Sequence, residues 1–358
     1  MGRCHANAFT AVSGLFDLPL IPVKVVLADA TDKIARKGAA DLGFARATSN
    51  WQDLIDDPLV DIVAITAPNG LHEPMALAAI AAGKTVYCEK PLSTTLESAQ
   101  RMRDAAQIAG IVTQVGFNFL QNPMVKLAKE ILDAGELGEV VNFRGRHAEN
   151  YMCNPLSPHS FRTDSTGGGA LADIGSHIVS LARHLMGPIN GVTAKQLCVH
   201  KYRPLRAGSV VQTPVVVDDI THALIDFSGG AMGSIEANWV ATGRTMDLSF
   251  EISGTKGAIA FSQENMNELK LWSGGHPGRE GFTRIEAGPK NHPYDRFCPA
   301  PGHHLGYNDL KIIEVASLLK AHAEKGQGYP DFKEACEVQR VIEAIQISAH
   351  RGKSKAVL

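Results

Sequence analysis

An aspartate and a histidine four residues apart are the first side chains that could do chemistry. In "GGGALADIGSHIVSLARHL", Asp173 and His177 share one face of a predicted helix. The opposite, apolar face consists of Leu171, Ile174, Ile178, Leu181 and Leu185. A histidine titrates near neutrality, so His177 could take a proton from an alcohol while Asp173 orients it or binds a neighbouring hydroxyl. The pattern alone favours a plainer interpretation, an Asp–His pair on a solvated helix face.

Polar residues also follow three successive apolar runs. Asp29 ends "VKVVLAD", "TAPNG" and His72 follow "DIVAIT", and Glu89 and Lys90 end "TVYCEK". In a doubly wound sheet, ligands bind outside the carboxyl ends of the strands, where these residues would lie. Plainer roles stay open: a helix N-cap for Asp29, a turn residue for Asn69 and a surface ion pair for Glu89 and Lys90.

The elements that must position these residues alternate regularly between Val23 and Phe117. Short apolar runs alternate with helical patterns at Ile34–Leu42, Pro74–Ala82 and Leu96–Ile108. This alternation predicts a parallel sheet with helices on both faces. The run Ile62–Ile65 is apolar at every position, which is typical of a strand buried on both faces.

The pattern changes after Phe117. A helix is predicted at Pro123–Ala134, and several glycine-punctuated β-rich runs at Val192–Trp272 predict an antiparallel sheet. Ser273–Gly306 is rich in Gly, Pro and His and is predicted to be a long loop. Two helices close the chain. We therefore expect two domains, residues 1–118 and residues 119–358, with the closing helix able to return to the first.

Composition narrows the class of partner. The 358 residues carry 35 basic and 37 acidic side chains without blocks of like charge, which argues against nucleic-acid and membrane surfaces and favours a small molecule. The six cysteines never form a C-x-x-C pair, so neither a zinc ribbon nor a dithiol motif is supported. We expect a reduced, cytoplasmic protein, because no run approaches the roughly 18 apolar residues of a membrane helix and the start lacks a secretory signal.

The segment "TAPNGLHEPMALAAIAAGKTVYCEKPLS" resembles the glucose–fructose oxidoreductase / inositol dehydrogenase family, also called Gfo/Idh/MocA. The family has a T-x-P-N-x-x-H turn, a helix, a G-K-x-V strand and an E-K-P triplet in this order. The resemblance continues through "GELGEV", "GGGALADIGSH" and the closing helices, so it covers essentially the whole chain. It implies an α/β fold: an N-terminal Rossmann-type doubly wound parallel sheet and a C-terminal α+β domain with a large, mostly antiparallel open sheet.

The resemblance implies an NAD-dependent dehydrogenase that oxidises a secondary alcohol of a sugar, cyclitol or sugar acid. Its catalytic residues would be Lys90, Asp173 and His177. Lys90 would hydrogen-bond the alcohol oxygen, and the family's E-K-P often carries a cis Lys–Pro bond at the position of Pro91. Whether His177 or Lys90 formally takes the proton is left open.

The same resemblance implies which residues hold NAD: Gly2, Arg3, Asp29, Thr66, Pro68, Asn69, His72, Glu89 and Lys90. An acidic Asp29 favours NAD over NADP, because it accepts hydrogen bonds from ribose hydroxyls and repels a 2′-phosphate.

The opening stretch "MGRCHANAF" matches the end of the family's dinucleotide-binding turn. Gly2 corresponds to the third glycine of G-x-G-x-x-G, and Arg3 and His5 follow as in relatives. We therefore expect a strand and two glycines to precede Met1 in the natural chain. Without them, the chain as given would bind NAD poorly.

Substrate contacts are predicted in the second domain and just before it. They are Asn118, Tyr151, His159, Arg162 and His304. Leu120 stands where relatives often have an arginine, which points to a different substrate. No metal is expected, because His303 and His304 lack a third ligand at suitable spacing. We expect a homodimer or homotetramer formed through an apolar open face of the sheet.

Two other functions compete with a dehydrogenase. One is an NAD-retaining glycoside hydrolase of the same fold, and the other is a non-catalytic NAD- and sugar-binding regulator. The joint presence of Lys90, Asp173 and His177 argues against the regulator.

Overall fold

The computed structural model describes residues 1–275 and 277–357 and divides into two compact units. The first unit contains Met1–Gln121 and Gly306–Cys336, and the second contains Asn122–Leu305 and the chain from Glu337 onward. Among the described residues, no helix is both long and apolar enough to cross a membrane. The predicted boundary at residue 118, with NAD binding assigned to residues 1–118 and substrate binding to residues 119–358, stays a prediction.

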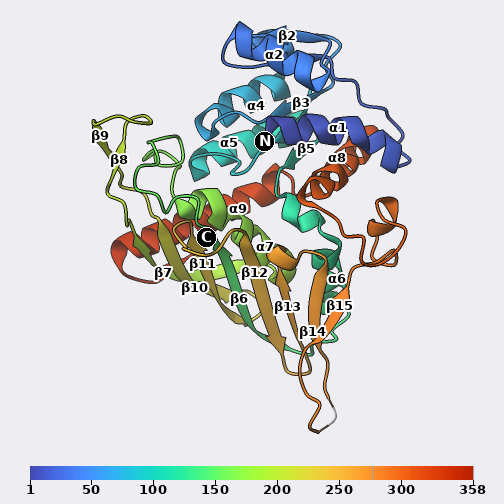
Figure 1. Ribbon diagram of the computed structural model, residues 1–358, viewed down its shortest axis with the longest axis vertical. Helices are drawn as coiled ribbons and strands as arrows, with labels where there is room; N and C mark the ends of the chain where they lie inside the picture. Colours follow the sequence, from blue (N-terminus) through green and yellow to red (C-terminus); the bar gives the residue numbers. More distant parts are fainter. Residues whose placement is uncertain (276, 358) are drawn as a thin grey trace. The chain divides into compact units, whose positions relative to one another are not determined.

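The first unit is built from parallel strands with intervening helices (Figure 1). Strands β1 (Val26–Ala28) and β2 (Arg46–Thr48) form one pair, and β3 (Ile62–Ile65), β4 (Thr85–Cys88) and β5 (Thr113–Val115) form a second sheet in that order. The helices are α1 (Gly2–Leu15), α2 (Asp32–Leu42), α3 (Trp51–Ile55), α4 (His72–Ala81), α5 (Leu96–Ala109) and α8 (Tyr307–Glu324), with short 3₁₀ turns at η1 (Asn69–Leu71) and η2 (Asn118–Gln121). The Rossmann-type fold predicted from the sequence is confirmed.

Side-chain caps determine where two of these helices begin. The Thr31 hydroxyl accepts the Ile34 amide at the start of α2, and the Thr95 hydroxyl accepts the Ser98 amide at the start of α5. Because Thr31 caps α2, the interpretation of Asp29 as a helix N-cap is wrong.

The strands of this sheet that are buried throughout are β4 and β5, not β3. All four residues of β4 are buried, as are all three residues of β5. In β3, Val63 and Ile65 are buried but Ala64 is exposed. The prediction that Ile62–Ile65 is buried on both faces is therefore wrong, since β3 is the end strand of its sheet in the described structure.

The second unit contains a nine-stranded sheet in the order β15-β14-β13-β12-β6-β11-β10-β7-β16. Strands β6 and β11 pair in parallel and the other neighbours pair antiparallel, which confirms the predicted mostly antiparallel sheet. The strands are β6 (Val140–Ala148), β7 (Ile189–Leu197), β10 (Ile220–Phe227), β11 (Met232–Asn238), β12 (Asp247–Gly254), β13 (Ala258–Ser262), β14 (Glu268–Trp272), β15 (Thr283–Glu286) and β16 (Lys355–Ala356). The predicted loop Ser273–Gly306 therefore contains a strand.

The remaining elements of the second unit are helices and short segments. They are α6 (Pro123–Asp133), a π turn η3 (Leu171–Gly175), α7 (Ser176–Met186), the later part of α9 (Phe332–Arg351), a hairpin of β8 (Tyr202–Pro204) and β9 (Gln212–Pro214), and 3₁₀ turns at η4 (Gln263–Asn265) and η5 (Tyr294–Arg296). Helix α7 packs against the middle of the sheet, where a Cβ on Gly145 would meet Ile178 Cδ1 at 2.7 Å. This close approach needs a glycine in β6.

The opposite face of the sheet is open and carries charge. Arg144 of β6 lies across from Glu251 of β12, with 3.9 Å between Nη1 and Oε1, and both point away from the helices. His222 and Glu236, which are paired on β10 and β11, line the same shallow hollow. Exposed Leu224 is an apolar neighbour on β10. The expectation of an apolar open face is wrong, because charged and apolar side chains alternate on it.

Replacing Gly145 by alanine should destabilise the second unit by about 1–3 kcal/mol, because the added methyl group would overlap Phe143 and Ile178 in a packed core. Urea unfolding followed by tryptophan fluorescence measures the change. Gly229→Ala is the matched control, because a Cβ at Gly229 meets nothing within 4 Å. Equal midpoints for the two variants would contradict the packing argument.

Candidate active site

The first turn of α1 lies against the end of β3. A Cβ on Gly2 would come within 3.1 Å of Thr66 Oγ1, so the helix start needs a small residue here. No side chain caps this helix, which leaves its first amides available to an anion. Arg3 extends outward, with its Nη2 3.8 Å from Asp41 Oδ2.

Asp29 directly follows β1 and is exposed. Its Oδ1 accepts the amide of the next residue, Ala30, at 2.7 Å, and the carboxylate faces solvent. Pro68 and Asn69 begin the turn after β3, and Asn69 opens the 3₁₀ turn η1. Asp29, Pro68 and Asn69 therefore lie at the carboxyl ends of β1 and β3.

His72 is buried at the start of α4 and joins two of these turns. Its Nδ1 lies 3.0 Å from the carbonyl of Pro91, and its Nε2 lies 2.9 Å from the carbonyl of Ala67. Burial lowers the pKa of His72, although the hydrogen bonds to these two carbonyls act to raise it. Both ring nitrogens face protein carbonyls, so the imidazole holds the turn after β3 to the E-K-P segment.

Glu89, at the end of β4, is the centre of a buried ionic cluster. Its Oε1 accepts from His5 Nε2 of α1 at 2.6 Å and from Lys311 Nζ of α8 at 3.0 Å. Lys311 is fully buried and also pairs with Glu314 at 2.7 Å, while the Tyr87 hydroxyl donates to Glu314. The interpretation of Glu89 and Lys90 as a surface ion pair is wrong, because Glu89 is only 5 % exposed and its partners come from two helices.

The electrostatics of this cluster favour charged Glu89 and charged Lys311. Burial alone would raise the pKa of Glu89, but Lys311 and His5 outweigh it and hold the pKa well below its usual range. Burial likewise opposes the charge on Lys311, yet Glu314 and Glu89 raise its pKa well above the ordinary value. Burial lowers the pKa of His5, so a neutral imidazole is favoured.

Lys90 follows directly after this fixed carboxylate. The side chain is half-buried, and the Lys90–Pro91 peptide is cis, as the family resemblance implied. A Cβ on Gly116 would come within 2.9 Å of Glu89 Oε1, so this glycine at the end of β5 makes room for the carboxylate. The cluster thus fixes the backbone that presents Lys90.

The sequence interpretation missed His5, Lys311, Glu314 and Tyr87 as members of this cluster. A usable signal was present, because Lys311 and Glu314 interrupt the otherwise apolar helical stretch "LKIIEVASLL" three residues apart. Charged residues on a helix face that must be buried imply a partner.

In the second unit, two donors converge on Asp173. Its Oδ2 accepts from the Tyr151 hydroxyl at 2.7 Å and from Arg162 Nε at 2.9 Å. Both donors come from the loop that precedes the π turn. Burial and the Asp173 charge raise the pKa of Tyr151 well above its usual value, so the phenol stays protonated and donates.

Asp173 lies on a π turn instead of the regular α-helix expected from the sequence. The turn starts after Gly169, whose φ is +105° and whose added Cβ would meet Asp218 Oδ1 at 2.2 Å. The Asp218 carboxylate accepts the Leu171 amide at 2.9 Å. This cap and the left-handed glycine start the segment tightly against β10. Single π turns often occur at functional sites.

His177 follows the π turn and is only 7 % exposed. Its ring packs on that of His147, with 5.6 Å between centroids, and His147 lies 2.8 Å from both the Ile174 carbonyl and Glu149 Oε1. The interpretation of Asp173 and His177 as a pair on a solvated helix face is wrong, because this face is buried against β6. His147 and Glu149 were not predicted, although "RHAE" directly precedes the loop of residues 150–169, which carries Tyr151 and Arg162.

The other predicted substrate residues are more scattered. His159 donates its backbone amide to Pro204 at 2.8 Å, and the exposed His304 lies 3.5 Å from Glu286. Asn118 of the first unit is buried, and its amide nitrogen has no hydrogen-bond partner among the described residues. Within residues 1–275 and 277–357, no three His, Cys, Asp or Glu side chains are arranged to hold a metal ion.

Comparison with protein families shows which family this chain belongs to. Residues 1–117 match the oxidoreductase family with an NAD-binding Rossmann fold, and residues 125–260 match the GFO/IDH/MocA C-terminal domain. The chain belongs to the Gfo/Idh/MocA oxidoreductase family. The family predicted from the E-K-P segment is confirmed, and the chain is an NAD-dependent oxidoreductase.

Known relatives match most or all of this family member. Levoglucosan dehydrogenase of Pseudarthrobacter phenanthrenivorans is 38% identical over 98% of this chain and 93% of its own length. A structure of levoglucosan dehydrogenase in complex with NADH and levoglucosan matches with a TM-score of 0.96, covering 100% of this chain and 96% of that one at 38% identity. The scyllo-inositol 2-dehydrogenase (NAD(+)) of Bacillus subtilis is 29% identical over 72% of this chain and 70% of its own length.

The residues of this Gfo/Idh/MocA chain fit NAD. The uncapped first turn of α1 can bind the pyrophosphate, and the exposed Asp29 carboxylate suits ribose hydroxyls.

Glu89→Gln should lower the free energy of unfolding at pH 7 by about 3–5 kcal/mol, because it removes one of the negative charges that balance the buried Lys311 ammonium. Glu89 has a depressed pKa, so its contribution is present above the ordinary value of 4.5 and is lost as the pH falls through the native pKa. The difference between wild type and variant should therefore shrink in acid. Urea unfolding across pH measures it.

Glu73→Gln is the control for that substitution, because Glu73 forms a surface ion pair with Arg101. Its effect should stay below about 1 kcal/mol. Equal losses for Glu89→Gln and Glu73→Gln would contradict the role given to the buried cluster.

Proposed function

We propose that this chain oxidises a secondary alcohol of a sugar or cyclitol, with Lys90, Asp173 and His177 as catalytic residues. The observation that carries the proposal is the convergence of Tyr151 and Arg162 on Asp173 beside the buried His177. Such a site offers a fixed carboxylate, a titratable ring and several donors to a polyol. Family membership and the dehydrogenases among the relatives support the same chemistry.

Each residue has a distinct role in this proposal. Bound NAD supplies the hydride acceptor. The Lys90 ammonium donates a hydrogen bond to the alcohol oxygen and stabilises negative charge that develops there. His177 takes the hydroxyl proton, alone or in a relay with Lys90, and Asp173 orients His177 or binds the neighbouring hydroxyl.

The substrate contacts proposed for this reaction are Asn118, Tyr151, His159, Arg162 and His304. Asn118 has support from its buried, unpartnered amide nitrogen, because such a group normally requires an acceptor. Tyr151 and Arg162 have support from their contacts with Asp173. The relative that acts on levoglucosan makes anhydrosugars the first substrates to test, with inositols next.

The cofactor site in this proposal consists of Gly2, Arg3, Asp29, Thr66, Pro68, Asn69, His72, Glu89 and Lys90. His72 and Glu89 would act indirectly, since their side chains are held by protein groups, whereas Asp29 would contact the ribose. We assign NAD binding to residues 1–118 and substrate binding to residues 119–358.

We further propose a homodimer or homotetramer through the open face of the sheet. Arg144, Glu236 and Glu251 offer charges of both signs on this face, so a second copy could complement them. A cytoplasmic location is supported by the cysteines, because all six are in the reduced thiol form.

Activity tests this proposal directly. Wild type should form NADH from at least one of a panel of anhydrosugars, sugars and inositols, and Lys90→Ala should lower kcat by about 10²-fold or more, since it removes charge stabilisation at the reacting oxygen. The rate is read from absorbance of NADH. Lys33→Ala, on the exposed face of α2, is the control and should leave kcat unchanged.

Two outcomes would contradict the proposal. Undiminished activity of Lys90→Ala would exclude the catalytic role of Lys90. Cleavage of a glycoside without net NADH would favour the NAD-retaining hydrolase instead.

Asp29→Ala should reduce the preference for NAD over NADP by about 10-fold or more, because it removes the acceptor for the ribose hydroxyls and the repulsion of a 2′-phosphate. The ratio of kcat/KM for the two cofactors measures it. Asp32→Ala, in the first turn of α2, is the matched control and should keep the wild-type ratio. An unchanged ratio in Asp29→Ala would exclude Asp29 from the ribose site.

A further inference from the structure

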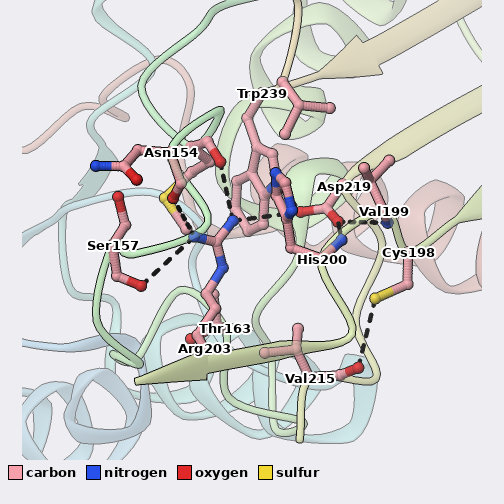
Figure 2. A network of polar contacts seen from close by, with 12 residues as sticks. Asn154, Ser157, Thr163, Cys198, Val199, His200, Arg203, Val215, Asp219 and Trp239 are labelled. Atoms are coloured by element: carbon pink, nitrogen blue, oxygen red, sulfur yellow. Dashed lines mark hydrogen bonds and ion pairs between the residues drawn. The ribbon is translucent and has the colours of Figure 1, made fainter. Parts of the chain in front are cut away.

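A fully buried arginine binds the substrate loop of the second unit, residues 150–169. The guanidinium of Arg203, on β8, donates to three backbone carbonyls of that loop (Figure 2). Nη2 lies 2.9 Å from the Met152 oxygen, and Nη1 lies 3.0 Å from the Asn154 oxygen and 3.5 Å from the Ser157 oxygen. One side chain thus hydrogen-bonds three carbonyls that lie outside any helix or strand.

The charge of Arg203 is matched by Asp219, whose Oδ1 is 3.9 Å from Nη2. Asp219 is itself held firmly, because it accepts from Trp239 Nε1 at 2.6 Å and from the backbone amides of Val199 at 2.6 Å and His200 at 2.9 Å. Both charged side chains are completely buried. A buried ion pair with this many hydrogen bonds is a rigid anchor, since breaking it would leave charges unpaired.

The anchored loop carries the donors that reach Asp173. Tyr151 directly precedes Met152, whose carbonyl is bound by Arg203 and whose amide donates to the Trp239 carbonyl at 3.1 Å. The ring of Tyr151 also packs edge-on against Trp239, with 6.1 Å between centroids. Any displacement of Met152 would therefore move the Tyr151 hydroxyl from Asp173.

We propose that Arg203 is a positioning residue for the reaction, acting through Tyr151. Its guanidinium fixes the carbonyls of Met152, Asn154 and Ser157, and so keeps the Tyr151 hydroxyl on Asp173. The catalytic part of this inference rests on the proposed function, whereas the structural part does not. Arginine suits the role because its planar fork offers several donors in fixed directions, which a lysine ammonium cannot reproduce.

Hydrogen–deuterium exchange tests the structural part without substrate. Arg203→Lys should raise the exchange rates of amides in residues 150–163 by about 10-fold or more, because their carbonyl anchors are lost. Exchange in α7 and β12 should not change. Arg206→Lys, an exposed arginine beyond the same strand, is the matched control and should behave as wild type. Unchanged exchange in Arg203→Lys would overturn the inference.

A measurement on wild type covers the case in which Arg203→Lys does not fold. In mild urea, amides of residues 150–160 and 199–204 should open with the same free energy, since Arg203 and Asp219 join the two segments. Independent opening of the two segments would overturn the inference.

A double-mutant cycle with Tyr151→Phe tests the link to catalysis. Arg203→Lys should lower kcat/KM for the sugar by about 10²-fold in the wild-type background but by less than about 3-fold in the Tyr151→Phe background, because both changes remove the same contact. The Kd for NADH should be unaffected. Additive losses would overturn the link. Failure of wild type to form NADH from any sugar would refute the proposed function, while the exchange experiments still decide whether Arg203 anchors the loop.

Discussion

A carboxylate buried at the end of a central strand is the constraint on which the first unit depends. Glu89 cannot keep its charge in this position without partners, and it obtains them from His5 of α1 and Lys311 of α8. The partners come from distant parts of the chain, so this carboxylate joins α1, the end of β4 next to Lys90, and α8. Because the buried carboxylate of Glu89 must be paired, its backbone is held in place. The backbone of the adjacent Lys90 is thereby held in place too.

The second unit solves a similar problem with consecutive buried carboxylates. Asp218 caps the π turn that carries Asp173, and Asp219 holds Trp239 and balances Arg203. The first carboxylate fixes the start of the π turn, and the second balances the arginine that binds the carbonyls of the loop before that turn. Both units therefore contain buried charged side chains that are paired with opposite charges or hydrogen-bonded to the backbone. Such groups are costly to misplace, which makes the sites rigid.

Local sequence patterns predicted the features that depend on residues close together in the chain. The β-α alternation, the Rossmann-type fold and the mostly antiparallel sheet followed from periodicity and from the E-K-P resemblance. The partners of Glu89 could not be predicted, because His5 and Lys311 are 84 and 222 residues away in sequence. The π turn was missed since its cause, the Asp218 cap at Leu171, is also a long-range contact. The charged open face was missed because strand register, a long-range property, brings Arg144 opposite Glu251 and His222 opposite Glu236.

Transfer of a substrate hydrogen to NAD is the central claim, and isotope labelling tests it most directly. The chain would be incubated with NAD and a sugar that carries deuterium on its ring carbons, and the nicotinamide product would be analysed by mass spectrometry. We expect each NADH formed to contain one deuterium, and Lys90→Ala to form little of it. Consumption of the sugar without deuterium in NADH would contradict hydride transfer and the catalytic assignment built on it.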